Sequence, residues 1–163
     1  EEGIGKISLD YDHDNRKFKM RQGRGCHSTI FITDKVPLGL SIDAGVVDLA
    51  VDLSNVQLTR LDMDSGVSDV MIRFGVKSGH IEANFDIGVS DLSVYIPEGT
   101  AVRLHRDTGL ASVSYRDLGL VKVSKETYES PNYGTADRTI DIEVDAGISD
   151  INLEYYDSGR VKL

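Results

Sequence analysis

The chain has 163 residues, a formal net charge of −9 and a hydrophobic content of 40%, which fits one globular domain with a sizeable core. The acidic excess argues against nucleic acid as a partner, because phosphates would be repelled. The single cysteine excludes an internal disulfide and a cysteine-rich zinc site. No apolar run reaches the ~18–20 residues that a membrane span requires.

The N-terminal segment, residues 1–37, has an irregular pattern and begins with Glu-Glu rather than methionine. We therefore expect that a leader, an anchor or another domain has been removed from this end. Residues 16–24, RKFKMRQGR, carry five cations, which are Arg16, Lys17, Lys19, Arg21 and Arg24. Phe18 and Met20 alternate with cations, which predicts a strand with one cationic face. We favour an edge strand protected by its charges, and the alternative is a patch for anionic lipid, a wall polymer or an acidic partner.

From residue 40 onward, the phrase D-x-G-(V/I/L)-x-D recurs along the chain. Its corner glycines are Gly45, Gly66, Gly88, Gly109 and Gly147, and the central copies are spaced by 21 or 22 residues. A truncated copy opens the chain at residues 3–9. Repetition at such a fixed period is typical of stacked repeats.

Within each copy, apolar and polar residues alternate. Leu61 and Met63 precede the corner and Val70 and Ile72 follow it, so we expect these four side chains to point inward from two short strands. Glycine at the corner would permit a positive φ, and the first aspartate would accept hydrogen bonds from nearby backbone amides. Each unit is therefore predicted to contain a strand, a corner, a second strand and a short polar loop that leads to the next unit.

These units predict an all-β fold in which coils of about 21 residues stack as a parallel β-helix-like solenoid, each copy on its predecessor. The alternative is a two-sheet antiparallel β-sandwich in which each D-x-G is a hairpin turn. We expect one repeat-built domain over residues 1–163. It divides into an irregular N-terminal segment (1–37), regular coils over 38–115, an insertion over 116–139 with a surface loop at 128–137, and a final coil over 140–163.

Stacked coils would place the aspartates of the phrase in two rows. One row holds Asp43, Asp64, Asp86, Asp107 and Asp145, and the other holds Asp48, Asp69, Asp91 and Asp150, with Ser112 in the fourth copy. At ~4.8 Å, adjacent like charges repel by about 0.9 kcal/mol in water. We expect the first aspartate to cap the corner and the second to face solvent, with no metal bound. The alternative is a calcium ladder made of Asp43, Asp48, Asp64, Asp69, Asp86, Asp91, Asp145 and Asp150.

No motif for catalysis is present: the sequence lacks G-x-S-x-G, a P-loop, a dinucleotide-binding fingerprint and H-E-x-x-H. The four histidines are scattered without ligand spacing. Cys26 and His27 are adjacent, so in a strand they would point to opposite faces rather than pair. We therefore expect no enzyme activity, no cofactor and no small-molecule substrate.

Several segments together resemble a known family. They are 37–49 (PLGLSIDAGVVDL), 88–102 (GVSDLSVYIPEGTAV), 108–113 (TGLASV), 130–136 (SPNYGTA) and 140–153 (IDIEVDAGISDINL). They resemble the C-terminal domain of LiaF-type cell-envelope-stress proteins and the wider toastrack group of adhesin-like domains, over about residues 36–155. The resemblance implies a right-handed stack of β-coils in bacterial membrane or exported proteins, and no catalytic residues are assigned to the group.

From this resemblance we expect a non-enzymatic interaction domain of the cell envelope, extracytoplasmic and anchored to the membrane by a segment outside this chain. It would contact a membrane or signalling protein in envelope-stress sensing, or act in adhesion. Two alternatives stay open: a calcium-dependent adhesin, and a β-helix that binds or cleaves wall glycans through paired carboxylates. The absence of tryptophan argues against the glycan alternative.

Overall fold

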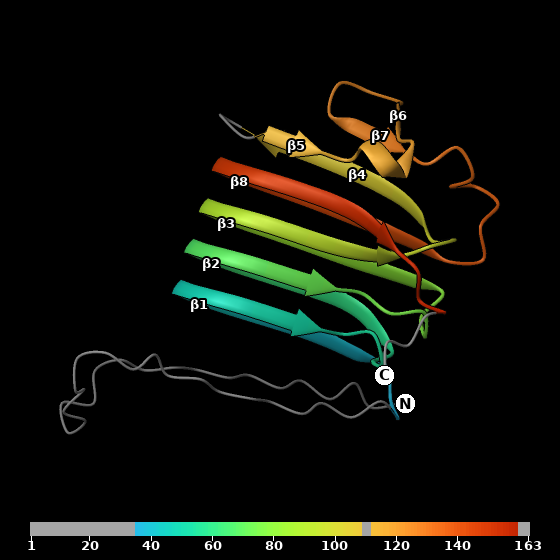
Figure 1. Cartoon of the computed structure of the whole chain (residues 1–163), viewed down its shortest axis with the longest axis horizontal. Helices are drawn as coiled ribbons and strands as arrows, with labels where there is room; N and C mark the ends of the chain where they lie inside the picture. Colours follow the sequence, from blue (N-terminus) through green and yellow to red (C-terminus); the bar gives the residue numbers. More distant parts are fainter. Residues whose placement is uncertain (1–34, 109–111, 160–163) are drawn as a thin grey trace.

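The computed structural model describes residues 35–108 and 112–159. Four long strands carry the copies around Gly45, Gly66, Gly88 and Gly147, and they are β1 (Leu38–Asp52), β2 (Leu58–Arg73), β3 (His80–Pro97) and β8 (Thr139–Tyr156). Each strand folds back on itself at its corner, so that its two arms form two layers (Figure 1). The fourth copy is split into β4 (Ala101–Thr108) and β5 (Ser112–Ser114). All these strands pair in parallel, which confirms the β-helix-like solenoid and excludes the antiparallel sandwich for the coils.

The core lies between the two layers. In β2, Leu61 and Met63 of the first arm and Val70 and Ile72 of the second arm are all buried, as the alternation predicts. Between the arms the alternation shifts by one residue, because Gly66 and Val67 both face outward. Because of this shift, the inward side chains of the two arms face the same core.

The corner glycines do not use the conformation that we expected. Among the described residues, positive φ occurs only at Gly99 and Gly119, both in turns outside the corners. A Cβ atom on Gly66, Gly88 or Gly147 would instead lie 2.6–2.8 Å from the carbonyl oxygen of the corner glycine in the neighbouring coil. Glycine is therefore needed because the coils approach closely at the corner, not because the backbone turns left-handed. Gly109 lies outside the described residues.

The coils do not stack in sequence order. The strand order is β1-β2-β3-β8-β4, so the last copy is inserted between the third and the fourth. The expectation that each copy stacks on its predecessor is wrong here. The physical reason is length: β8 pairs with β3 along both arms, from His80↔Thr139 to Pro97↔Tyr156, whereas β4 spans only one arm. Pairing the two longest copies satisfies more backbone groups and buries more apolar surface.

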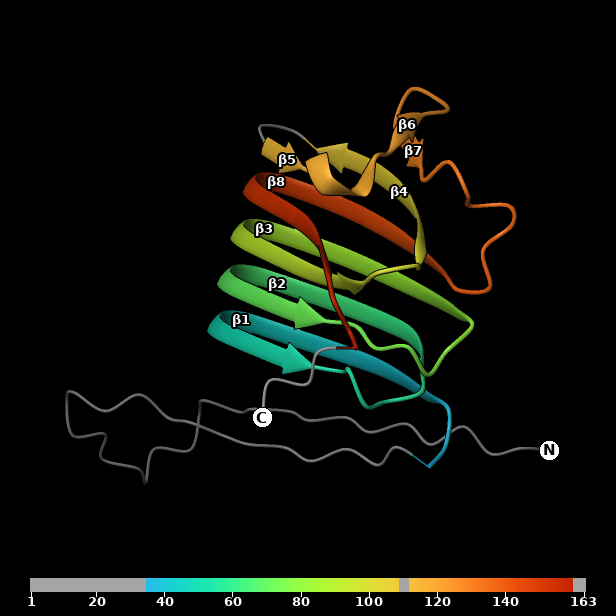
Figure 2. The ribbon, with the colours of Figure 1, turned by 45° about the vertical axis from the view of Figure 1, so that its right-hand side comes forward.

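The insertion covers the outer edge of β4. It contains a short 3₁₀ helix, η1 (Arg116–Leu118), and the strands β6 (Val121–Lys122) and β7 (Thr127–Glu129). Strand β7 pairs antiparallel with β4, and β6 pairs antiparallel with β7 (Figure 2). Tyr128 and Ser130 are buried, so the segment 128–137 is not wholly the surface loop that we expected. The antiparallel hairpin ends the parallel stack and protects the β4 edge from further pairing.

Within the described ranges, no helix is long and apolar enough to cross a membrane.

Candidate functional site: the charged face and the corners

The first arms of the coils present a charged outer face, on which parallel pairing aligns the outward side chains in rows. One row runs Arg60, Glu82, Asp141, Arg103 and Glu129 across five strands. The next row runs Ser41, Asp62, Asn84, Glu143, His105 and Thr127. Cations and anions therefore lie next to one another in this region of the face.

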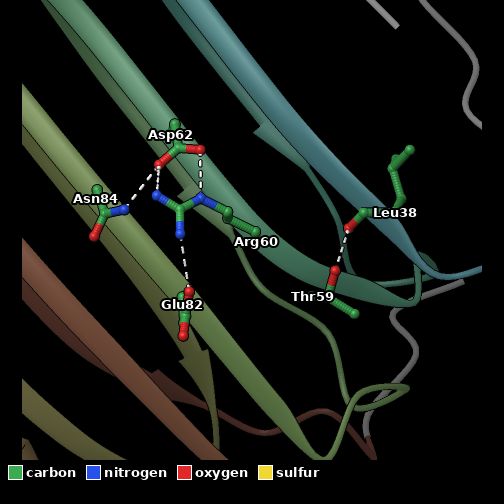
Figure 3. Close-up of polar contacts among 6 residues, drawn as sticks. All are labelled: Leu38, Thr59, Arg60, Asp62, Glu82 and Asn84. Atoms are coloured by element: carbon green, nitrogen blue, oxygen red, sulfur yellow. Dashed lines mark hydrogen bonds and ion pairs between the residues drawn. The ribbon is translucent and has the colours of Figure 1, made fainter. Parts of the chain in front are cut away.

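Arg60 pairs with two carboxylates on one part of the charged face. Its guanidinium donates to both carboxylate oxygens of Asp62, at 2.6 and 2.8 Å, and to Glu82 at 3.0 Å (Figure 3). The amide of Asn84 donates to the same Asp62 carboxylate at 2.8 Å. The hydrogen bonds from Arg60 favour the charged carboxylate and lower the pKa of Asp62 below its usual value.

Arg103 pairs with two carboxylates on another part of this face. It contacts Glu129 at 2.7 Å and Asp141 at 3.5 Å, and its guanidinium lies 4.1 Å from the ring centre of Tyr133. The Tyr133 hydroxyl donates a hydrogen bond to Asp141. Burial, together with this bond to a carboxylate, raises the pKa of Tyr133 to about 12. These groups hold the loop around Tyr133 against β8 and β4.

The aspartate row beside the corner differs from both rows above. Asp43, Asp64, Asp86, Asp145 and Asp107 are paired in register across five strands, and all are exposed. Across residues 35–108 and 112–159, no ion pair or hydrogen bond involves these carboxylates, and so the expected capping of the corner amides is not seen. The second row, Asp48, Asp69, Asp91 and Asp150, is also exposed and aligns with Ser112.

A groove of about 520 Å³ follows the first aspartate row. Six carboxylates line it, from Asp43, Asp62, Asp64, Asp86, Glu143 and Asp145. Parallel pairing spreads them along the stack instead of gathering them around one point. No group of three or more possible metal-binding side chains is found in the described region of the chain. The groove is therefore an extended acidic surface, and the calcium ladder remains an alternative hypothesis.

Between the two aspartate rows lies an apolar row that sequence reasoning missed. Val67, Val89 and Ile148 are paired in register and are 51%, 50% and 58% exposed. We call these three residues the corner stripe. The signal was present in the sequence, because an aliphatic residue follows the glycine in every copy. The exposure of this aliphatic residue was not evident, because it depends on the shift in alternation at the corner.

Other predicted residues are not brought together. The basic segment with Arg16, Lys17, Lys19, Arg21 and Arg24 lies outside the described residues, as does Cys26. The two described histidines each contact a threonine: His80 lies 2.8 Å from Thr139 and His105 lies 3.2 Å from Thr127. These contacts tie neighbouring strands together on the charged face.

The geometry defines a class of protein: a β-solenoid built from repeats, with rows of exposed side chains on its faces and corners. Residues 1–95, more than half of the chain, match the model of the N-terminal domain of toast_rack, DUF2154. The chain belongs to the toast_rack family. The predicted kinship with the toastrack group is thereby confirmed.

The fold is also similar to the crystal structure of a "putative cell adhesion protein" from Clostridium sporogenes, with a TM-score of 0.69 and 24% sequence identity. The match covers 77% of this chain and 58% of that protein, so the chain spans less than two thirds of its length. No curated protein matches the chain. At this identity the likeness concerns the fold.

Proposed function

We propose that the chain is a non-enzymatic interaction domain of a bacterial exported or membrane-anchored envelope protein, which acts through protein–protein contact in stress signalling or adhesion. The observation that carries this proposal is the corner stripe. Three aliphatic side chains, each about half exposed, line up between two rows of exposed carboxylates. Exposed apolar residues gathered in one place and bordered by charge are typical of contact surfaces.

The comparisons support the same proposal. The chain belongs to the toast_rack family, and the similar structure from Clostridium sporogenes is named for cell adhesion. Neither assigns a partner to this chain, and the surface chemistry provides the more specific argument.

The glycan alternative receives less support from the site. Glycan cleavage uses two carboxylates on either side of a sugar, one of them with a raised pKa. The only aromatic side chain that lines the acidic groove, among the described residues, is Phe85, which is 2% exposed. The groove therefore offers no aromatic surface on which a sugar ring could stack.

Photo-crosslinking in living cells tests the proposed function. A photoreactive residue at Val89 should link the full-length protein to another envelope protein, whereas one at Val121, on the β6 hairpin, serves as the comparison site. Protease added to whole cells should cleave the domain if it lies outside the membrane. Residence in the cytosol together with failure to crosslink at any exposed site would contradict the proposal.

Two solution measurements address the alternatives. Calcium at millimolar concentration should leave the melting temperature unchanged, since the carboxylates of the described residues form rows instead of a cage. The purified chain should release no fragments from cell-wall material. A rise in melting temperature with calcium, or the release of wall fragments, would favour the corresponding alternative.

A further inference from the structure

We propose that the corners bind a cationic helical segment of a partner protein, one with a narrow apolar stripe flanked on both sides by lysine or arginine. This inference rests on the proposed function and names the chemistry of the partner. The docking surface consists of the corner stripe, Val67, Val89 and Ile148, together with the aspartate rows on each side of it.

The order of side chains around each corner determines which partner fits. In β3 the sequence D86-I-G-V-S-D91 places Val89 between two outward carboxylates, and β2 and β8 repeat this arrangement in register. A partner that fits must therefore carry an apolar centre with positive charge on both sides. A segment that is cationic but lacks the apolar centre would leave the corner stripe in water.

The spacing of the coils matches the pitch of a helix. Neighbouring coils are ~4.8 Å apart, because the pairing is that of a parallel sheet. The pitch of an α-helix is ~5.4 Å. A helix that lies along the stack thus places about one apolar side chain per turn on each of Val67, Val89 and Ile148, and over three coils the mismatch is only ~1 Å. Its residues on both sides of the stripe then face the aspartates.

The rest of the charged face differs from the corners. There the fold supplies its own counter-charges, as Arg60 does for Asp62 and Glu82, and Arg103 does for Glu129 and Asp141. The carboxylates of Asp64, Asp86 and Asp145, in contrast, stand exposed in one row. An opposite charge from outside would relieve their mutual repulsion.

The same charges exclude other classes of partner. Anionic lipid headgroups, nucleic acids and phosphate-rich polymers would be repelled by two rows of aspartate. A purely apolar partner would force those carboxylates next to apolar surface without compensation. The observations therefore favour a basic amphipathic segment of a protein.

The direct test is a binding titration of the whole chain with two designed helical peptides of about four turns. In the first peptide, one leucine per turn forms a stripe flanked by lysine and arginine. The second has the same composition, but its leucines are distributed around the helix. We expect the first peptide to bind about tenfold more tightly or better, and its affinity to fall as salt rises. Equal binding of the two peptides would show unspecific charge attraction and overturn the proposal.

Variants of the chain locate the binding. Replacing Val67, Val89 and Ile148 by serine should weaken binding of the striped peptide about tenfold or more without disturbing the core, since all three side chains are exposed. Serine at Val121 and Val123, which are 56% and 53% exposed on and beside β6, is the matched control and should have no effect. Unchanged binding by the corner variant would likewise overturn the inference.

The crosslinking experiment separates this inference from the proposed function. If the Val89 position captures a protein through a segment that is neither cationic nor helical, the interaction domain stands and the proposed partner chemistry is wrong. If Val89 captures a basic helical segment and the serine variant abolishes capture, both are supported.

Discussion

The carbonyl oxygen of Gly66 lies 2.6 Å from the point where a Cβ atom on Gly88 would be placed. A methyl group at Gly88 would therefore collide with the backbone of the neighbouring coil, which cannot move without breaking the parallel pairing on both sides. Gly88→Ala should destabilise the chain by about 2 kcal/mol or more, a magnitude typical of overpacking. The free energy of unfolding in urea measures this effect.

Gly45 supplies the matched control. Around its Cβ position nothing lies within 4 Å, and its φ is not positive. Gly45→Ala should therefore be neutral, or should stabilise by up to about 1 kcal/mol through the unfolded chain. Equal losses for the two alanine variants would show that the corners need glycine for its conformation and not for close approach.

The position of β8 can be tested with engineered disulfides in a chain whose Cys26 is replaced by serine. Ser93 of β3 and Ser114 of β5 both pair with Asn152 of β8, from opposite sides. The Cα atoms of the pair S93C/N152C lie one strand spacing apart, ~4.8 Å, so this pair should form a disulfide. Those of the pair S93C/S114C lie two spacings apart, ~9.6 Å, so this pair should not. Stacking in sequence order would reverse this result, which non-reducing electrophoresis and mass spectrometry would show.

Repulsion along the aspartate row predicts a stabilising substitution. Asp86 lies between Asp64 and Asp145, so Asp86→Asn removes two like-charge contacts. We expect a gain of the order of 1 kcal/mol at low salt, shrinking as salt screens the charges. Asp62→Asn, one row away, should instead lower stability because it removes the negative charge that pairs with Arg60. A loss of stability in Asp86→Asn would indicate that the carboxylate has a favourable partner.

The Tyr133 hydroxyl should make stability depend on alkaline pH. Because its pKa in the folded chain is about 12, against an ordinary value of 10.0, folding favours the neutral phenol. The contribution of the neutral hydroxyl to the free energy of unfolding is complete below about pH 10 and is lost as the pH rises through about 12. The free energy of unfolding should fall over this range by at most about 1.4 kcal/mol per pH unit. Tyr133→Phe should make the free energy of unfolding depend less on pH in this range. In an ultraviolet titration, the same variant should lack one tyrosine whose pKa is about 12. Loss of a tyrosine that ionises near its ordinary pKa of 10.0 would contradict the contact with Asp141.

Much of the fold was predictable because it depends on local periodicity. The alternation around Leu61 and Val70 identifies the inward face, and the recurring glycine identifies the corner. The position of β8 was not predictable in this way. All copies carry nearly the same phrase, so any of them could pair with any other, and the choice depends on the lengths of β3, β8 and β4.

The candidate surface was predictable only to a degree. The aspartates were expected in rows, and the register places them in rows. No role was predicted for the apolar residue after each glycine, whose exposure follows from the shift of one residue in the alternation at the corner. Likewise Arg60 and Arg103 carry no motif, and their contacts with Glu82 and Asp141 join strands that lie apart in the sequence.

The insertion of β8 between β3 and β4 also constrains the order of events during synthesis. Strands β3 and β4 leave the ribosome before β8, yet the structure leaves no room for them to pair with each other. Until residues 139–156 are available, β3 presents an open parallel edge and β4 lacks its main neighbour. Any premature β3–β4 pairing would have to be undone before β8 could insert, and such unpaired edges are the regions of a β protein most exposed to misassembly. Final closure of the stack requires residues 139–156, and it is expected to be slow because the contacts of β8 with β3 join distant parts of the sequence.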